Sequence, residues 1–353
     1  MLAIAGRLIG KGYPTYITFE AGPTHYGIDN AKKLVEKAAL AGADAVKFQI
    51  VDPDRLVPDK KQLFSYEVLI DRETGAREKI VEPLYDILKR RCMSREEWIE
   101  VKKYCDEQGI TFFSTATFWD EVDFLAELGV DTIKICSGDV DFFQLIRKCA
   151  RMGMCIQLDT GNATLGEVER AVDNALEEGC ERILIHHCPS GYPARLESIN
   201  LRIIPTLERL FGFPVAFSDH SPGWEMDIAA VALGANMIEK TITLDRTTRS
   251  VEHLFSLEPE EMRAFVQAVR DLEKALGSTR KIMSREEREN SLAVRRSIVL
   301  AREVEAGEEV TEEVLDYARP GSGLRPEMAA LLKGRTFACH LGKGHILGLS
   351  DIK

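Results

Sequence analysis

The chain has 353 residues, of which 45% are hydrophobic and 29% charged, a composition typical of a globular protein with one large and one small domain. Its net charge of −11 excludes a general nucleic-acid binder, because such proteins present a basic face. No apolar run is long enough to span a membrane, and residues 1–20 lack a signal-peptide pattern. The eight cysteines form no CxxC pair, so we expect reduced thiols and a cytoplasmic location.

Short β-branched or aromatic runs alternate with longer amphipathic segments along most of the chain. Strands are expected at 16–20, 44–49, 110–116, 132–137, 155–161, 182–188, 215–221 and 237–243. Most of these runs are apolar through the middle, as strands buried on both faces are. Eight strand-then-helix units predict an α/β fold in which the strands close into a parallel (β/α)₈ TIM barrel.

Two segments interrupt this alternation. Residues 50–95 are polar and too long for a simple connection, which predicts a functional lid over the barrel. Residues 279–290 are highly charged and are expected to form a linker. The predicted organisation is therefore a barrel domain over 1–278, a linker over 279–290 and a compact, turn-rich β domain over 291–353.

In such a barrel the active site lies at the carboxyl ends of the strands. Lys47 and Lys134 occur inside otherwise apolar strands, and a buried lysine must find an anion because an unpaired buried ammonium is very costly. The two lysines can converge with Thr115, Ser137 and Ser218 to form a phosphate or carboxylate site. Internal salt bridges with Glu20, Asp159 or Glu239 are the structural alternative, and a Schiff-base lysine is the competing catalytic role.

Three histidines lie at or near strand ends. His220 follows a Ser-Asp pair at the end of the strand over 215–221, which favours a metal-binding or acid–base role. His186 and His187 are adjacent in one strand and must point to opposite faces. At most one of that pair therefore faces the barrel interior.

Seven collinear motifs resemble the sialic acid synthase family. They are FEAGPTHYG, AGADAVKFQ, IKICSGD, HHCPSGYPA, FSDHSPG, AVALGANMIEKTITLDR and LEPEEM. The C-terminal stretches RRSIVLAREVEAGEEVTEE, ARPGSGL and LLKGRTF resemble the antifreeze-like (SAF) domain of that family. The similarity runs in order from about residue 15 to residue 353, so it covers nearly the whole chain.

The resemblance implies a C–C bond-forming transferase that condenses phosphoenolpyruvate with an open-chain N-acetylated hexosamine such as N-acetylmannosamine. The products would be a nine-carbon 2-keto sugar acid and phosphate. By similarity, Lys47, Thr115, Lys134, Ser137 and Ser218 would hold phosphoenolpyruvate, and Tyr192 would lie against the sugar. The further substrate contacts expected are Gln49, Asp159, Ser190 and Glu252.

The resemblance also implies catalytic groups and a partner. Glu20 matches an acid near the reacting carbons, and it joins Lys47, Lys134 and His220 as the expected catalytic residues. His220 matches one of two family histidines that bind a divalent ion, magnesium or manganese. Arg319 matches an arginine that the SAF domain delivers to the sugar of the neighbouring subunit, which implies a domain-swapped homodimer.

Four positions depart from the family pattern. Thr24 stands where asparagine is usual, Asp159 where serine is usual, Thr241 where the second metal-binding histidine is usual, and Glu252-His253 where an Asp-His pair is usual. A threonine hydroxyl is a poor ligand for a transition metal. The site is therefore expected to hold a metal through His220 and oxygen ligands, to recruit His253, or to work without a metal.

Three functions follow from these observations. The leading hypothesis is a nonulosonic acid synthase that acts on a variant sugar. The second is a pyruvate aldolase that forms a Schiff base on Lys47 or Lys134. The third is a non-catalytic protein that binds phosphoenolpyruvate or sugar, in which Thr241 marks a lost metal site.

Overall fold

The computed structural model describes residues 2–353. The chain divides into two compact units, Met1–Gly277 and Ser278–Lys353, and each has its own hydrophobic core. None of the helices within residues 2–353 combines the length and the apolar character that crossing a membrane requires.

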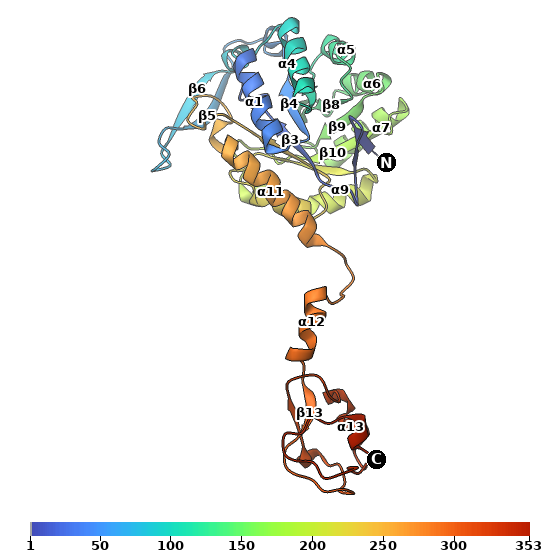
Figure 1. Cartoon of the computed structure of the whole chain (residues 1–353). Coiled ribbons are helices and arrows are strands. Elements are labelled where there is room, and N and C mark those ends of the chain that lie inside the picture. The colour runs from blue at the N-terminus through green and yellow to red at the C-terminus, as the bar shows by residue number, and fades with distance from the viewer. Residues whose placement is uncertain (1) are drawn as a thin grey trace. The chain divides into compact units, whose positions relative to one another are not determined.

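The first unit is a closed barrel of eight parallel strands (Figure 1). The strands are β3 (Tyr16–Glu20), β4 (Ala45–Gln49), β7 (Thr111–Thr115), β8 (Thr132–Ile135), β9 (Cys155–Asp159), β10 (Ile183–His187), β11 (Val215–Asp219) and β12 (Met237–Thr241). They follow one another around the barrel in chain order, and β12 pairs with β3 to close it. The predicted fold class is confirmed, and β9 to β12 are buried along their whole length, as strands covered on both faces must be.

Helices follow the strands and cover the outside of the barrel (Figure 1). They are α1 (Ile28–Ala41), α4 (Arg95–Glu107), α5 (Trp119–Glu127), α6 (Phe143–Arg151), α7 (Leu165–Glu177), α8 (Leu196–Ile199), α9 (Ile204–Phe211), α10 (Glu225–Ala232) and α11 (Pro259–Leu276). Helix α7 begins at a capping box, in which the backbone N–H of Thr164 donates to Oε2 of Glu167 over 2.7 Å. The longer of these helices, such as α1, α7 and α11, each bury one apolar stripe against the barrel.

The segment predicted to be a lid contains a β-hairpin between short helices. The hairpin pairs β5 (Leu63–Leu69) with β6 (Arg77–Pro83) and extends from the barrel (Figure 1). Helices α2 (Pro53–Leu56) and α3 (Leu84–Lys89) flank it. A small hydrophobic cluster that is separate from the barrel core holds the hairpin; it consists of Tyr66, Val68, Ile87 and Val251. A second hairpin, β1 (Leu2–Ile4) with β2 (Arg7–Ile9), was not predicted.

The second unit is small and rich in turns. Its elements are α12 (Arg285–Val294), β13 (Ser297–Leu300), β14 (Leu315–Ala318) and α13 (Ala329–Leu332), with short 3₁₀ turns between them. Residues 285–290, within the predicted linker, form the first turns of α12. The reason is a capping box at Ser284, whose hydroxyl accepts from the backbone N–H of Glu287 over 3.0 Å.

Candidate active site

Lys47 and Lys134, at the strand ends, both pair with one carboxylate inside the mouth of the barrel. Nζ of Lys47 is 2.7 Å from Oε1 of Glu239, and Nζ of Lys134 is 2.8 Å from Oε2 of the same side chain. Lys47 also forms an ion pair with Glu20, and Lys134 lies 3.0 Å from Oδ1 of Asp159. The structure therefore brings the lysines together around an anion that belongs to the protein, which is the internal salt-bridge alternative.

This buried cluster keeps both lysines charged. Burial opposes the charged form of Lys47, but the carboxylates of Glu20 and Glu239 outweigh it and raise its pKa well above the usual value. Burial is likewise outweighed at Lys134, where Asp159 and Glu239 raise the pKa. Schiff-base formation requires a neutral amine, so the raised pKa values argue against the aldolase hypothesis.

A chain of polar side chains surrounds Lys134, which is completely buried. Oγ of Ser218 is 3.1 Å from Nζ of Lys134, and Nδ1 of His186 is 2.8 Å from that hydroxyl and 3.2 Å from that ammonium. Nε2 of His186 is 2.9 Å from Oε1 of Gln157, whose amide nitrogen donates to Thr132 over 3.0 Å. Gln157 therefore accepts the Nε2 proton, and the Nδ1 lone pair faces Lys134.

His186 is the interior member of the histidine pair. Its pKa is lowered well below the usual value by burial and by the charge of Lys134, so the ring is neutral. The ring of His187 instead contacts the backbone carbonyl of Ile199 outside the strand. His186 and Gln157 were not assigned to the site from the sequence. The signal that could have indicated them is a histidine and a glutamine inside otherwise apolar strands.

The remaining predicted donors lie around the same strand ends. Nε2 of Gln49 donates to Oε2 of Glu20 over 3.3 Å, and Thr115 pairs in register with both Gln49 and Lys134. Hydroxyls of two serines crowd Gly161, where an added Cβ would lie 2.5 Å from Oγ of Ser137 and 3.0 Å from Oγ of Ser190. The backbone oxygen of Cys188 would lie 2.8 Å from the same Cβ, so a side chain at this position would push the two loops apart.

His220 lies at the end of β11 beside Tyr192. The two ring centroids are 4.6 Å apart, and Nδ1 of His220 is 3.3 Å from the carbonyl oxygen of Pro189. Burial lowers the pKa of His220, which favours the neutral ring. If Nδ1 donates its proton to Pro189, the lone pair on Nε2 remains available for a proton or a cation.

A buried ion pair fixes the turn that carries His220. Lys240 pairs with Asp219 and donates to the backbone oxygen of Ser221 over 2.6 Å, while Asp227 lies 3.4 Å from the same ammonium. Oδ1 of Asp219 accepts from the backbone N–H of Ser221 over 2.9 Å. The residues on both sides of His220 are therefore held by one lysine.

Replacing this lysine, Lys240→Met, is expected to lower the free energy of unfolding by about 3–5 kcal/mol, because it leaves buried Asp219 unpaired. Urea denaturation measures the loss. The matched control is Lys274→Met, which removes an exposed ammonium 3.1 Å from Asp271 and should cost less than about 1 kcal/mol. Equal stability of the two variants would contradict the positioning role.

The donor set near His220 does not make a preorganised transition-metal site. Thr241 offers only a hydroxyl. His253 is engaged elsewhere, since its Nδ1 is 2.7 Å from Oγ1 of Thr243 and burial lowers its pKa to about 4. The one group of three His, Cys, Asp or Glu ligand atoms that lie close together in residues 2–353 is outside the barrel. No catalytic step is therefore assigned to a metal.

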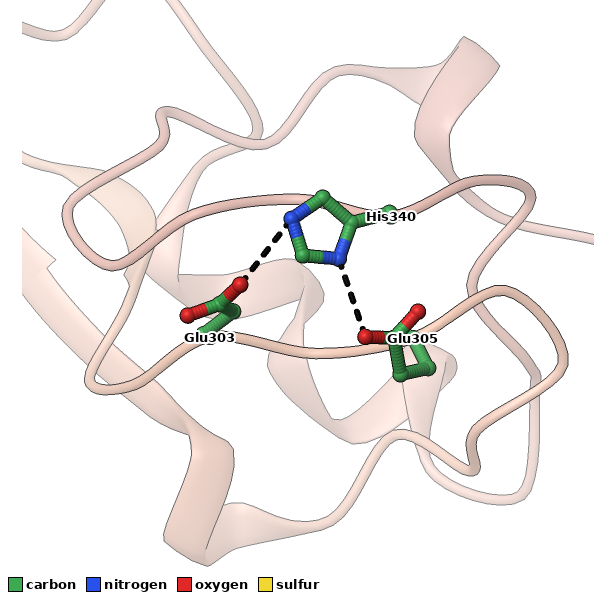
Figure 2. A group of neighbouring side chains, drawn as sticks. All are labelled: Glu303, Glu305 and His340. Atoms are coloured by element: carbon green, nitrogen blue, oxygen red, sulfur yellow. Dashed lines mark hydrogen bonds and ion pairs between the residues drawn. The ribbon is translucent and has the colours of Figure 1, made fainter.

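That group consists of Glu303, Glu305 and His340, all exposed, in the second unit (Figure 2). Nε2 of His340 is 3.0 Å from Oε1 of Glu303, and its Nδ1 is 3.2 Å from Oε1 of Glu305. The ring nitrogen that faces one carboxylate therefore points away from the other, unlike ligands arranged around a single ion.

Tyr192 and Glu252 line a cavity of about 230 Å³ that extends to hairpin β5–β6. Arg91 lines the same cavity and is only 7% exposed. It lies in a charged, aperiodic run after α3, where no sequence pattern marks an inward side chain. Arg319 lies in the second unit and is exposed.

Comparison with known proteins identifies the family to which the chain belongs. The model of the NeuB family matches residues 34–281, and that of the SAF domain matches residues 295–353. The N,N'-diacetyllegionaminic acid synthase of Legionella pneumophila is 35% identical over 346 residues, which cover 96% of this chain and 94% of that protein. The protein of the same name from Campylobacter jejuni is 36% identical over 313 residues, 88% and 92% of the two chains.

A solved structure agrees with these matches. The N-acetylneuraminic acid (sialic acid) synthetase of Leptospira borgpetersenii superposes with a TM-score of 0.71 at 29% identity, covering 82% of this chain and 94% of that one. The same family is indicated by three observations: the eight-stranded barrel, the motifs at its strand ends and the two family models. The chain therefore belongs to the NeuB family, the sialic acid synthase family that its motifs resemble, and carries a C-terminal SAF domain.

Proposed function

We propose that the protein condenses phosphoenolpyruvate with an open-chain N-acetylated aldose to give a nonulosonic 2-keto sugar acid and phosphate. As a member of its family it is a C–C bond-forming transferase. The observation that carries the proposal is the pair of charged lysines, Lys47 and Lys134, gathered at the strand ends. Phosphoenolpyruvate has a carboxylate and a phosphate, which the two ammonium groups can attract against the opposing charge of Glu20, Asp159 and Glu239.

In the proposed reaction, the π electrons of the C2=C3 bond of phosphoenolpyruvate attack the aldehyde carbon. A C–C bond forms, and the aldehyde oxygen takes up a proton. Water adds at C2, where positive charge develops, and the C2–O bond to phosphate then breaks to leave the ketone. We assign Glu20, which lies beside Lys47, the role of accepting a proton from that water.

The other contacts follow from the positions of the side chains. We propose that hydroxyl donors hold phosphoenolpyruvate beside the lysines and that polar groups at the mouth contact the sugar. The proposed donors to phosphoenolpyruvate are Thr115, Ser137 and Ser218; the proposed sugar contacts are Gln49, Ser190, Tyr192 and Glu252. His220 is proposed to act at the aldehyde oxygen: protonated from solvent at Nε2, it donates that proton as the C–C bond forms and returns to the neutral ring.

Asp159 adds a negative charge beside Lys134, so the cluster holds two ammonium groups against the carboxylates of Glu20, Asp159 and Glu239. Asp159→Ser is therefore expected to lower the KM for phosphoenolpyruvate about tenfold, because one like charge near the bound anion is removed. Steady-state phosphate release at varied phosphoenolpyruvate measures this. Asp141→Ser, at an exposed position, is the control and should leave the KM unchanged. A raised KM in Asp159→Ser would contradict the expectation.

The proposal is tested with purified protein, phosphoenolpyruvate and a panel of aldoses that includes N-acetylmannosamine and diacetamido deoxyhexoses. Phosphate release should depend on an added aldose, and the product should be a 2-keto acid of matching mass. Absence of phosphate release with every aldose, with or without added magnesium or manganese, would reject the synthase. Tight binding of phosphoenolpyruvate without turnover would favour the non-catalytic alternative, and borohydride trapping of pyruvate on a lysine would favour the aldolase.

We also propose that the protein acts in the cytoplasm as a domain-swapped homodimer. All eight cysteines are free, which suits a reducing compartment. In the proposed dimer, the SAF domain of one subunit presents Arg319 to the sugar at the barrel mouth of the other subunit. A guanidinium matches this role because its five donors can contact several sugar oxygens at once.

A further inference from the structure

Asp159 is the most exposed member of the charge cluster at the strand ends. Its side chain is 11% exposed, against 5% for Glu20, Lys47 and Glu239 and 0% for Lys134. In this cluster three carboxylates face two ammonium groups, which leaves one excess negative charge. An anion that enters the cluster therefore adds charge to a site that is already negative, and Asp159 is the carboxylate most open to it.

Lys134 has no N–H to spare for a bound anion. Four acceptors surround its Nζ: Oε2 of Glu239 at 2.8 Å, Oδ1 of Asp159 at 3.0 Å, Oγ of Ser218 at 3.1 Å and Nδ1 of His186 at 3.2 Å. An ammonium group has only three N–H donors. An anion can therefore contact this nitrogen only when it displaces one of these acceptors.

Of the two carboxylates on Lys134, that of Asp159 is held less firmly. Glu239 pairs with a second ammonium, since its Oε1 is 2.7 Å from Nζ of Lys47. Asp159 meets one ammonium group and, at 3.5 Å, the hydroxyl of Ser218. Its charged form therefore loses less than that of Glu239 when an anion approaches Lys134.

The main chain beside Asp159 is held in place. Thr160 donates its backbone N–H over 3.1 Å and its hydroxyl over 2.9 Å to the carbonyl oxygen of His186 in the neighbouring strand β10. A shift of the strand that would carry Asp159 away from an incoming anion must break both hydrogen bonds. The repulsion is more readily relieved by a change in the charge of the carboxylate itself.

A proton on Asp159 provides this change. The neutral carboxyl group no longer repels the anion, and its O–H becomes a hydrogen-bond donor. Burial already raises the pKa of Asp159, against the opposing charge of Lys134, and the charge of a bound anion would raise it further. The proton comes from solvent and returns to solvent when the anion leaves.

The other groups around Asp159 are poorer proton acceptors. Protonation of His186 at Nδ1 would place a second cation 3.2 Å from Lys134. Burial opposes the charged form of Glu239, but the two lysines outweigh it and lower its pKa. Burial raises the pKa values of the nearby thiols and phenol, which therefore stay neutral. The titratable groups that face Asp159 are Lys47 of β4, Lys134 of β8, His186 of β10, Glu239 of β12, and Cys136, Cys188 and Tyr192 after β8 and β10.

We propose that Asp159 takes up a proton when phosphoenolpyruvate binds, so that a repelling carboxylate becomes a hydrogen-bond donor to the bound anion. This inference rests on the proposed function, since phosphoenolpyruvate is the substrate of that reaction. Binding then favours the protonated carboxyl group. Affinity therefore falls as the pH rises from the pKa of Asp159 in the free protein towards its higher pKa in the complex.

Calorimetric titration of the full chain with phosphoenolpyruvate alone, in two buffers of different ionisation enthalpy, counts the protons taken up. At pH 7.5, where a phosphate monoester is itself almost fully ionised, the wild type should take up at least about half a proton. Its Kd should then rise at least about threefold between pH 7.5 and 8.5. Absence of proton uptake by the wild type would overturn the inference.

Two variants of Asp159 locate the proton. Asp159→Ser and Asp159→Asn should each bind phosphoenolpyruvate with less than about a tenth of a proton taken up, and their Kd should change less than about 1.5-fold over the same pH range. Circular dichroism and urea denaturation verify that each variant is folded. Uptake retained in a folded variant would place the proton on another group or on the substrate and would overturn the inference.

Asp139→Asn is the matched control. Asp139 follows strand β8 by four residues, and burial and the charge of Asp141 raise its pKa to about 6, so it is another acid that titrates near neutral pH. This variant should keep the proton uptake of the wild type. Loss of uptake in Asp139→Asn would contradict the assignment to Asp159.

Binding is measured without an aldose, so the result does not depend on turnover. Phosphoenolpyruvate that binds with proton uptake at Asp159 but is never condensed would support this inference and reject the proposed function. Turnover together with binding that takes up no proton would do the reverse. If phosphoenolpyruvate does not bind at all, both are rejected.

Discussion

Glu239→Gln is expected to reduce turnover by at least about 100-fold and to lower the free energy of unfolding by about 3 kcal/mol. One carboxylate holds both Lys47 and Lys134, through separate oxygens at 2.7 and 2.8 Å. The neutral amide of glutamine cannot neutralise either ammonium group. Its NH₂ group would also face one of the two lysines, so that two sets of hydrogen-bond donors would point at each other. Each lysine would keep one carboxylate, Glu20 for Lys47 and Asp159 for Lys134, but the shared bridge that fixes the two ammonium groups relative to each other would be lost.

Phosphate release and urea denaturation of the same preparation measure both losses. Glu178→Gln is the control, because it removes a carboxylate 2.6 Å from Arg151 at the surface and should cost less than about 1 kcal/mol without loss of turnover. A Glu239→Gln protein of unchanged stability and full activity would show that Glu239 does not organise the lysines.

The second large effect is expected from Arg319→Ala, which should lower turnover about 100-fold while leaving stability unchanged, because the side chain is exposed. The proposed domain swap, in which Arg319 of one subunit serves the barrel of the other, allows a more specific test. Lys134→Met and Arg319→Ala should each be inactive alone, but mixed subunits would join one intact barrel to one intact Arg319.

Mixing the two variants after reversible dissociation should restore about a quarter of the wild-type turnover, since half of the dimers are mixed and each has one complete site. If Arg319 served the barrel of its own chain, no mixed dimer would contain a complete site and turnover would stay absent. Arg325→Ala, another exposed arginine of the second unit, is the control and should remain fully active.

The barrel and its inward lysines could be predicted because they follow from strong local patterns. Eight apolar runs at regular spacing leave few alternatives to a closed parallel sheet, and a lysine within such a run must meet an acid. What the sequence could not decide was the identity of that acid. Lys47 and Lys134 were each compatible with a bound substrate or with Glu239, which lies 192 and 105 positions away.

The parts that escaped prediction depend on contacts between distant segments. Arg91 lies in a run of charged residues typical of a solvated surface, and its burial involves a distant segment, since its Nη1 donates to the carbonyl oxygen of Gly22. His186 was noticed, but its tautomer depends on Gln157 in the neighbouring strand β9. The start of α12 was assigned to a linker because its charged composition outweighed the cap at Ser284.

The separate hydrophobic cluster that holds hairpin β5–β6 has a consequence for how the sequence of this segment can diversify. Because Tyr66 and Val68 pack with Ile87 and Val251 rather than with the barrel core, residues 63–83 can change without disturbing the strands that carry the lysines. The hairpin and the lysine-bearing strands therefore belong to separate hydrophobic clusters. Exchange of this hairpin for that of a relative is accordingly expected to leave the barrel folded.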